Sequence, residues 1–260
     1  MNNVALLRYG RKLFYTYRDA FKHHAFLMDR IQYGSLNIKK GDIVIDAGAF
    51  TGGFAIWASG LVGPYGRIIA IEPHPHHFKI LKANVLINRL HNVILINKAI
   101  SDREGKVSLT GAGPGAHISN MGGFEVKTTT LDKILKEHNL AKADILKMDI
   151  EGSEIRALKT FQKLQDAREV AVEAHGARSL HYVVNCLNKM GFRISVLDSS
   201  MLIRNIIKQP SMLPFLTLAE LKSRFWQSRL WLKYFLGFEN HPVPACRDPN
   251  LKLILARKAY

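Results

Sequence analysis

Two carboxylates and two glycines in the first third of the chain have the types and spacing of a nucleoside-binding site. Asp46 and Gly48 follow the β-branched run 43–45, and Gly52 comes shortly after them. Glycines at such a turn let the backbone bend tightly and approach a ligand closely. Glu72 ends the next apolar run, and the carboxyl ends of neighbouring parallel strands share one crevice in a doubly wound sheet. Glu72 is therefore expected to accept hydrogen bonds from both hydroxyls of a ribose.

The spacing of these glycines disfavours a dinucleotide. Non-glycine residues separate Gly48 from Gly52, so the close glycine pair of the G-x-G-x-x-G fingerprint is missing. A carboxylate at Asp46 would repel a pyrophosphate but would suit a cationic ligand with an amino group, such as S-adenosylmethionine. A nicotinamide oxidoreductase is thus disfavoured, and an ordinary strand–helix turn without a ligand is the alternative interpretation.

Three further polar residues lie at the ends of two later apolar runs. Asp149 lies at the end of one, and Glu173 and His175 lie on one face at the end of the next. A hydroxyl that accepts a methyl group must lose its proton, and the candidate bases are Asp149, Glu151, Glu173 and His175. Of these, His175 is the best base by intrinsic pKa. With Glu151 these residues could instead hold a divalent metal that acidifies the acceptor, or form a structural pair. The sequence does not choose between these roles and assigns no metal ligand.

Strands and helices alternate along the chain, which predicts a doubly wound α/β fold with a largely parallel sheet. A short β insertion is expected from segments 107–109 and 124–128. The expected strands are 42–47, 67–72, 93–99, 144–150, 169–174, 192–197 and 251–257, and the expected helices are 52–62, 75–89, 131–138, 153–163 and 178–190.

Four regions are expected. Residues 1–40 form an N-terminal helical extension, residues 41–199 form the core, residues 200–249 form a basic helical insertion near the substrate side, and residues 250–260 carry the last core strand. Within the insertion, apolar and basic stripes run side by side over 213–238. This pattern indicates an interfacial helix, a nucleic-acid-facing helix or a cap helix over the active site.

Composition limits the partners and the compartment. The 260 residues include 37 Lys+Arg and 21 Asp+Glu, a formal charge of +16 that favours nucleic acid, an anionic membrane surface or an acidic substrate. A solvated basic surface is the alternative. The cysteines Cys186 and Cys246 are too few and too scattered for a disulfide framework or a zinc site, which fits a cytoplasmic location. We expect neither a secretory signal nor a membrane span.

Five short segments, by their sequences and their order along the chain, resemble the FkbM family of S-adenosylmethionine-dependent methyltransferases. The resemblance covers about residues 40–175, and its most specific segment is Leu-Lys-Met-Asp-Ile-Glu-Gly-Ser-Glu at 146–154. The other segments are Val-Ile-Asp-Ala-Gly-Ala at 44–49, Ile-Glu-Pro-His-Pro at 71–75, Asn-Lys-Ala-Ile-Ser-Asp-Arg-Glu-Gly at 97–105 and Thr-Thr-Thr-Leu-Asp at 128–132.

The resemblance implies a class I methyltransferase fold, which is Rossmann-like with a seven-stranded sheet and an antiparallel last strand. It also implies S-adenosylmethionine as cofactor, with Asp149, Glu173 and His175 near the chemistry. In this fold the cofactor residues would be Asp46 and Gly48 at the methionine end, Gly52 in the turn, Glu72 at the ribose, and Ser101 and Asp102 at the adenine.

The sequence therefore predicts a methyltransferase that acts on a hydroxyl of a small polar acceptor, such as a sugar, a lipid headgroup or another metabolite. The alternative is a basic protein that binds RNA or a membrane surface and methylates that partner or is inactive. The oligomeric state and any dependence on metal are left open.

Overall fold

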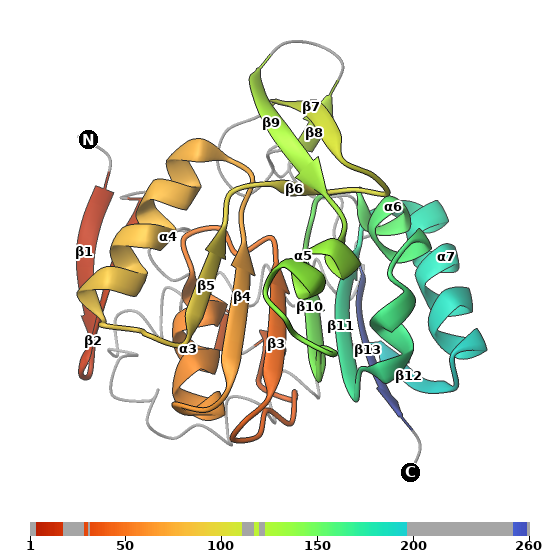
Figure 1. The fold of residues 1–260 in the computed structure, drawn as a ribbon, viewed down its shortest axis with the longest axis horizontal. Coiled ribbons are helices and arrows are strands. Elements are labelled where there is room, and N and C mark those ends of the chain that lie inside the picture. The colour runs from red at the N-terminus through yellow and green to blue at the C-terminus, as the bar shows by residue number, and fades with distance from the viewer. Residues whose placement is uncertain are drawn as a thin grey trace, which may run out of the picture.

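A computed structural model describes residues 4–17, 29–30, 32–110, 117–119, 123–196 and 252–258. Its centre is a seven-stranded sheet in the order β12-β13-β11-β10-β3-β4-β5 (Figure 1). The strands are β3 (Ile43–Ala47), β4 (Arg67–Ile71), β5 (Val93–Ile96), β10 (Ile145–Met148), β11 (Glu169–Ala174), β12 (Phe192–Val196) and β13 (Lys252–Lys258).

The strand directions confirm the predicted class I methyltransferase fold. Strands β5, β4, β3, β10 and β11 pair in parallel, and β13 inserts antiparallel between β11 and β12. The parallel strands are rich in β-branched residues because helices cover both faces of the sheet, so most side chains of the central strands are buried. All side chains of β10 and β11 are buried, for example.

Two hydrophobic cores lie on opposite faces of this sheet. Neighbouring residues of β3 alternate between them, since Val44 packs with α3 (Gly53–Val62) and α4 (Pro75–Ile87) whereas Ile45 packs on the other face. That other face is covered by α5 (Leu131–Glu137), α6 (Glu154–Lys159) and α7 (Gly176–Lys189), and a 3-10 helix, η2 (Gln162–Asp166), follows α6.

The predicted β insertion is a four-stranded sheet that stands above one end of the main sheet in Figure 1. It contains β6 (Ala99–Ile100), β7 (Gly105–Thr110), β8 (His117–Ser119) and β9 (Phe124–Thr129). The expected strand 93–99 is interrupted between β5 and β6. The Asn97 side chain lies in this break and donates to the carbonyls of Glu72 and Pro73, at 2.8 and 3.0 Å.

The expectation of a helical N-terminal extension is wrong for residues 4–17. They form a hairpin of β1 (Val4–Tyr9) and β2 (Lys12–Tyr17), with Gly10 in the turn at a φ of 60°. Among the described residues of this region, helical structure is confined to 29–30 and 32–33. The cause is tertiary. Backbone amides at the free edge of β2 donate to the side chains of Asn84 in α4 and of Asn88 at its C-terminal end, whereas in a helix the same amides would bond within the helix.

The predicted basic insertion 200–249 lies outside the described residues. The last strand, β13, begins and ends one residue later than predicted. No helix in the described parts of the chain combines the length and the apolarity needed to cross a bilayer.

Candidate active site

The glycine turn after β3 packs against the ends of both neighbouring strands. The amides of Gly48 and Ala49 donate to the Ile71 carbonyl of β4, at 3.0 and 2.9 Å. Gly48 has a φ of 81°, and a Cβ there would lie 1.7 Å from the carbonyl oxygen of Asp149. Gly52 closes the turn, donating to the Ala49 carbonyl at 2.8 Å. The turn thus lies at the carboxyl ends of three adjacent strands, where doubly wound folds bind their ligands.

Asp46 lies beneath this turn and pairs with a buried lysine. Lys147 Nζ lies 3.0 Å from Asp46 Oδ1 and donates to the Gly48 carbonyl at 2.7 Å. Burial raises the pKa of Asp46, and the charge of Lys147 opposes this rise. Burial alone would lower the pKa of Lys147, but the charges of Asp46 and neighbouring acids raise it above its usual value. The sequence analysis missed Lys147, although a lysine within a buried strand is a signal, since buried lysines are almost always paired.

Glu72 joins the glycine turn to the segment that follows β4 through its two carboxylate oxygens. Oε2 accepts from the Phe50 amide and Oε1 accepts from the His74 amide, each at 2.8 Å. The residue is buried at the end of β4, as predicted. Each carboxylate oxygen can still accept another hydrogen bond, so contact with a ribose stays a prediction that this geometry permits.

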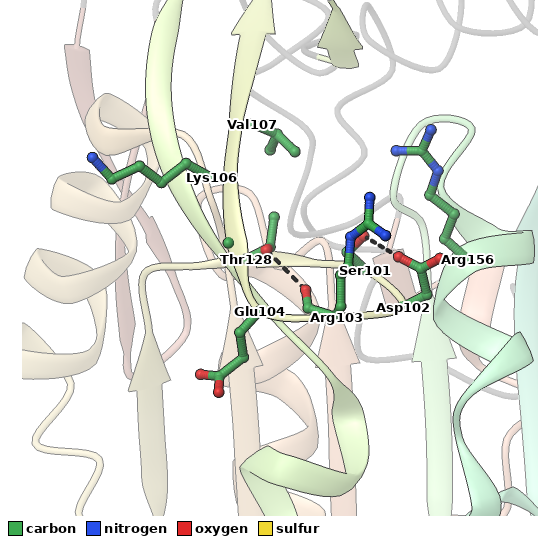
Figure 2. A pocket seen from close by; sticks show the side chains of 9 residues that line it. Ser101, Asp102, Arg103, Glu104, Lys106, Val107, Thr128 and Arg156 are labelled. Carbon is green, nitrogen blue, oxygen red and sulfur yellow. Dashed lines mark hydrogen bonds between the residues drawn. The ribbon is translucent and has the colours of Figure 1, made fainter.

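Ser101 and Asp102 line a separate recess of about 180 Å³ between β7 and α6. Figure 2 shows Asp102 between Arg103 and Arg156, with Ser101 Oγ donating to Asp102 Oδ1 at 3.2 Å. None of the other predicted site residues lines this recess. The expected contact of Ser101 and Asp102 with an adenine stays a prediction.

Asp149, Glu151 and His175 come together where β10 and β11 end. His175 Nε2 lies 3.2 Å from Glu151 Oε2 and 3.8 Å from Asp149 Oδ1. All three side chains are partly exposed, so they are reachable from solvent. The structure therefore unites two of the predicted catalytic residues, Asp149 and His175, with Glu151, which the sequence offered as a candidate base or metal ligand.

A buried glutamate orients the histidine of this cluster. Glu154 Oε1 lies 2.9 Å from His175 Nδ1 and accepts from the Gly152 amide at 2.9 Å. Its other oxygen accepts from Ser179 Oγ at 2.9 Å, and the residue is fully buried. The sequence analysis gave Glu154 no role, because an acid in the first turn of a helix is common for reasons of the helix dipole alone.

The surrounding carboxylates favour the protonated form of His175. Burial alone would lower the pKa of His175, but hydrogen bonds with Glu151 and Glu154 and the nearby negative charges raise it to about 11. The role of His175 as a base stays a prediction, and this environment opposes it unless a cation displaces the proton. Burial raises the pKa of Asp149 to about 6, against the opposing charge of Lys147.

Glu173, the third predicted catalytic residue, is buried and accepts a hydrogen bond from the N-terminal region. The Tyr33 hydroxyl donates to Glu173 Oε1 at 2.9 Å. Burial and the charge of Asp149 raise the pKa of Glu173 to about 8, which favours its neutral form. Lys147 Nζ lies 5.5 Å from the centre of the Tyr33 ring. No local sequence signal identifies Tyr33, since its partner is 140 residues away.

Asp29 is a further acid that the sequence analysis missed. Burial raises the pKa of Asp29 to about 7, and both the charge of Lys147 and a hydrogen bond from the Phe54 backbone oppose this rise. Asp29 and Tyr33 therefore bring side chains from the described helical residues 29–30 and 32–33 to the site.

Comparison with known proteins identifies the family. Residues 46–194, more than half of the chain, match the Methyltransferase FkbM domain. The 31-O-demethyl-FK506 methyltransferase FkbM of Streptomyces tacrolimicus is 27% identical over 219 residues, which cover 69% of this chain and 82% of that protein. The Hexuronic acid methyltransferase AglP of Haloferax volcanii is 28% identical over 142 residues, which cover 53% of this chain and 57% of that relative.

Solved structures agree on the fold. The FkbM methyltransferase of Methylobacillus flagellatus KT has a TM-score of 0.52 at 18% identity, covering 65% of this chain and 44% of that one. The Precorrin-6y C5,15-methyltransferase of Geobacter metallireducens GS-15 has a TM-score of 0.50 at 14% identity, covering 90% and 88%. The chain belongs to the FkbM family of methyltransferases.

Proposed function

We propose that this methyltransferase uses S-adenosylmethionine to methylate a hydroxyl group of a small polar acceptor, such as a sugar, a lipid headgroup or another metabolite. The observation that carries the proposal is the Gly48 turn, which packs against the backbone of Asp149 beside a crevice rich in carboxylates. The name of one relative, a 31-O-demethyl-FK506 methyltransferase, supports an oxygen acceptor, and the name of another, a hexuronic acid methyltransferase, supports a sugar acceptor.

The charge of the crevice suits a cationic donor. Asp46 and Lys147 offset each other, whereas Asp149, Glu151 and Glu154 surround the single positive charge of His175. This local excess of negative charge occurs in a chain whose formal charge is +16. S-adenosylmethionine carries a sulfonium and an ammonium, and the sulfonium charge is lost on transfer. The crevice would therefore attract the donor more strongly than the product.

The transfer itself needs little chemistry from the protein, because the sulfonium already activates the methyl group. The acceptor oxygen forms a bond to the methyl carbon as the carbon–sulfur bond breaks, and S-adenosylhomocysteine leaves. Alignment of oxygen, methyl and sulfur supplies much of the acceleration. The acceptor hydroxyl must also lose its proton, and we assign the cluster of Asp149, Glu151 and His175 to that side of the reaction.

The test has two stages. Titration calorimetry with S-adenosylhomocysteine, with NADH as control, should show saturable binding of the first ligand alone. Incubation with methyl-labelled S-adenosylmethionine and a panel of uronic acids, neutral sugars, polyols, vesicles and RNA should then label a small acceptor in an alkali-stable ether linkage. Alkali-labile label would indicate a methyl ester and overturn the hydroxyl proposal. Label in RNA or vesicles would favour the alternative of a basic RNA- or membrane-binding protein.

A further inference from the structure

We propose that Asp149, Glu151 and His175 form a binding site for one divalent metal ion beside the acceptor. These residues are brought together by the ends of two adjacent strands, β10 and β11, although they lie apart in the sequence. The binding of the ion is independent of the methyl acceptor, whereas its catalytic role rests on the proposed function.

The distances fit a single ion. One carboxylate oxygen from each acid and one ring nitrogen of His175 all lie within 4.8 Å of one another. Nε2 is 3.2 Å from Glu151 Oε2 and 3.8 Å from Asp149 Oδ1. Both separations are shorter than about 4.2 Å, which is twice a typical metal–ligand distance of about 2.1 Å. One ion can therefore contact Nε2 and either oxygen without any movement of the backbone.

The histidine is already held as a metal ligand would be. Metal-binding histidines almost always engage a carboxylate or carbonyl through the ring nitrogen that faces away from the metal. Here the Glu154 carboxylate hydrogen-bonds to His175 Nδ1, which directs Nε2 toward Asp149 and Glu151. Glu154 is itself fixed by the Gly152 amide and the Ser179 hydroxyl and is fully buried.

One oxygen of the cluster lacks a hydrogen-bond donor. Asp149 Oδ1 is inaccessible to solvent and accepts no hydrogen bond from any described residue. A buried oxygen without a partner is costly, so such atoms usually face a water or an ion that completes them. The same oxygen is the one that faces His175 Nε2. A divalent cation between them, bound with release of the His175 Nε2 proton to water, would supply the missing partner and offset the excess negative charge of the cluster.

The donor set indicates the type of metal. Two carboxylate oxygens favour Mg²⁺ or Mn²⁺, and an imidazole nitrogen shifts the preference toward Mn²⁺ or later transition metals. A site with three protein ligands leaves positions open for water or substrate. A cation in this place would draw electron density from an acceptor hydroxyl and favour loss of its proton to water. The oxygen would then be free to take the methyl group.

The experiment measures metal binding directly. The full chain is stripped with EDTA and titrated with Mn²⁺, and free Mn²⁺ is followed by its electron paramagnetic resonance signal. We expect one saturable site per chain, weakened at least about tenfold in Glu151→Gln and in Glu154→Gln. The matched control is Glu125→Gln, which alters an exposed glutamate paired with Lys106 and should bind Mn²⁺ as the wild type does.

A second measurement uses the wild type alone, so that it does not depend on the folding of a variant. Electron spin echo modulation of the bound Mn²⁺ should show coupling to an imidazole nitrogen. Absence of that coupling, no saturable Mn²⁺ binding, or equal binding in Glu151→Gln and wild type would each overturn the metal site. The cluster would then be an ion-pair network that keeps the proton on His175.

Titration of the same preparations with S-adenosylhomocysteine separates the two proposals. Product binding without Mn²⁺ binding overturns the metal site and leaves the proposed function intact. Mn²⁺ binding with the imidazole signature but without product binding supports the metal site and overturns the proposed cofactor.

Discussion

Lys147 and Asp46 face each other across the adjacent strands β10 and β3, with Nζ 3.0 Å from Oδ1 and both residues almost fully buried. Lys147 also donates to the Gly48 carbonyl, so one ammonium joins two strands and the glycine turn. The charge of each partner is tolerated in the interior because the other is present.

Replacing Lys147 should therefore cost much of the stability of the fold. Lys147→Met leaves Asp46 buried without its partner, and we expect the free energy of unfolding to fall by about 3–5 kcal/mol. Urea denaturation measures this loss, and Lys79→Met, at an exposed lysine, is the control. Adding Asp46→Asn to Lys147→Met should restore part of the loss. Equal effects of the Lys147 and Lys79 variants would show that the pair does not stabilise the fold.

Gly48 should tolerate substitution less well than Gly52. Both have positive φ, but a Cβ on Gly48 meets the backbone oxygen of Asp149, whereas a Cβ on Gly52 meets the movable side-chain end of Leu81 at 2.6 Å. We expect Gly48→Ala to abolish binding of S-adenosylhomocysteine and Gly52→Ala to weaken it, as measured by calorimetry. Gly60→Ala, in open space within α3, should bind normally. Normal binding by Gly48→Ala would separate this turn from the cofactor.

Substitution of Asn84 and of Asn88 should have different effects, although both side chains hydrogen-bond to the backbone at the edge of β2, as a neighbouring strand would. Asn84 exchanges hydrogen bonds with the backbone of Tyr15, at 2.6 and 2.8 Å, and also donates to the Thr51 carbonyl in the glycine turn at 2.8 Å. Asn88 exchanges bonds with the backbone of Leu13, at 3.0 and 2.5 Å, without reaching the turn.

Both Asn84→Ala and Asn88→Ala should thus lower the free energy of unfolding by about 1–3 kcal/mol, because partly buried backbone groups of β2 lose their partners. Only Asn84→Ala should also weaken binding of S-adenosylhomocysteine. Thermal or urea unfolding and calorimetry measure the two effects. Equal product affinity in the two variants would mean that the hairpin and the glycine turn are not coupled through Asn84.

Glu72→Ala should weaken binding of S-adenosylhomocysteine by about 1–3 kcal/mol, the usual cost of leaving buried donors unpaired. The matched control is Glu169→Ala, a buried glutamate at the start of β11 that accepts from the Asn37 amide at 3.1 Å. The control should lose stability but keep its affinity for the product. Unchanged affinity in Glu72→Ala would remove Glu72 from the cofactor site.

The stability of the chain should depend on pH through Glu173. Its pKa is about 8 in the folded chain and near 4.5 when exposed, so between these values the folded state keeps a proton that the unfolded state releases. Stability contributed by this group is present at low pH and falls as pH rises toward 8. Relative to Glu173→Gln, the wild type should lose up to roughly 1 kcal/mol per pH unit in this window. Urea denaturation from pH 5 to 8 measures the difference, and a constant difference would contradict the shifted pKa.

The sequence by itself determined the alternating strands and helices and the position of the glycine turn. These features depend on local patterns: consecutive β-branched residues predict strands buried on both faces, and Gly48 lies where the chain must bend. The same reasoning failed at residues 4–17, because a short amphipathic segment takes its conformation from its neighbours. The amides that fix β2 lie 69 and 75 residues away along the chain.

Only the tertiary structure decided the chemistry of the candidate site. The sequence contains Asp149, Glu151, Glu154 and His175, but their charges interact only because β10 and β11 end side by side. That packing surrounds His175 with carboxylates that raise its pKa, and the fold brings the Tyr33 hydroxyl to Glu173. Secondary structure follows from neighbours within a few residues, whereas a pKa depends on every charge and on the burial around it, and these are set by the fold.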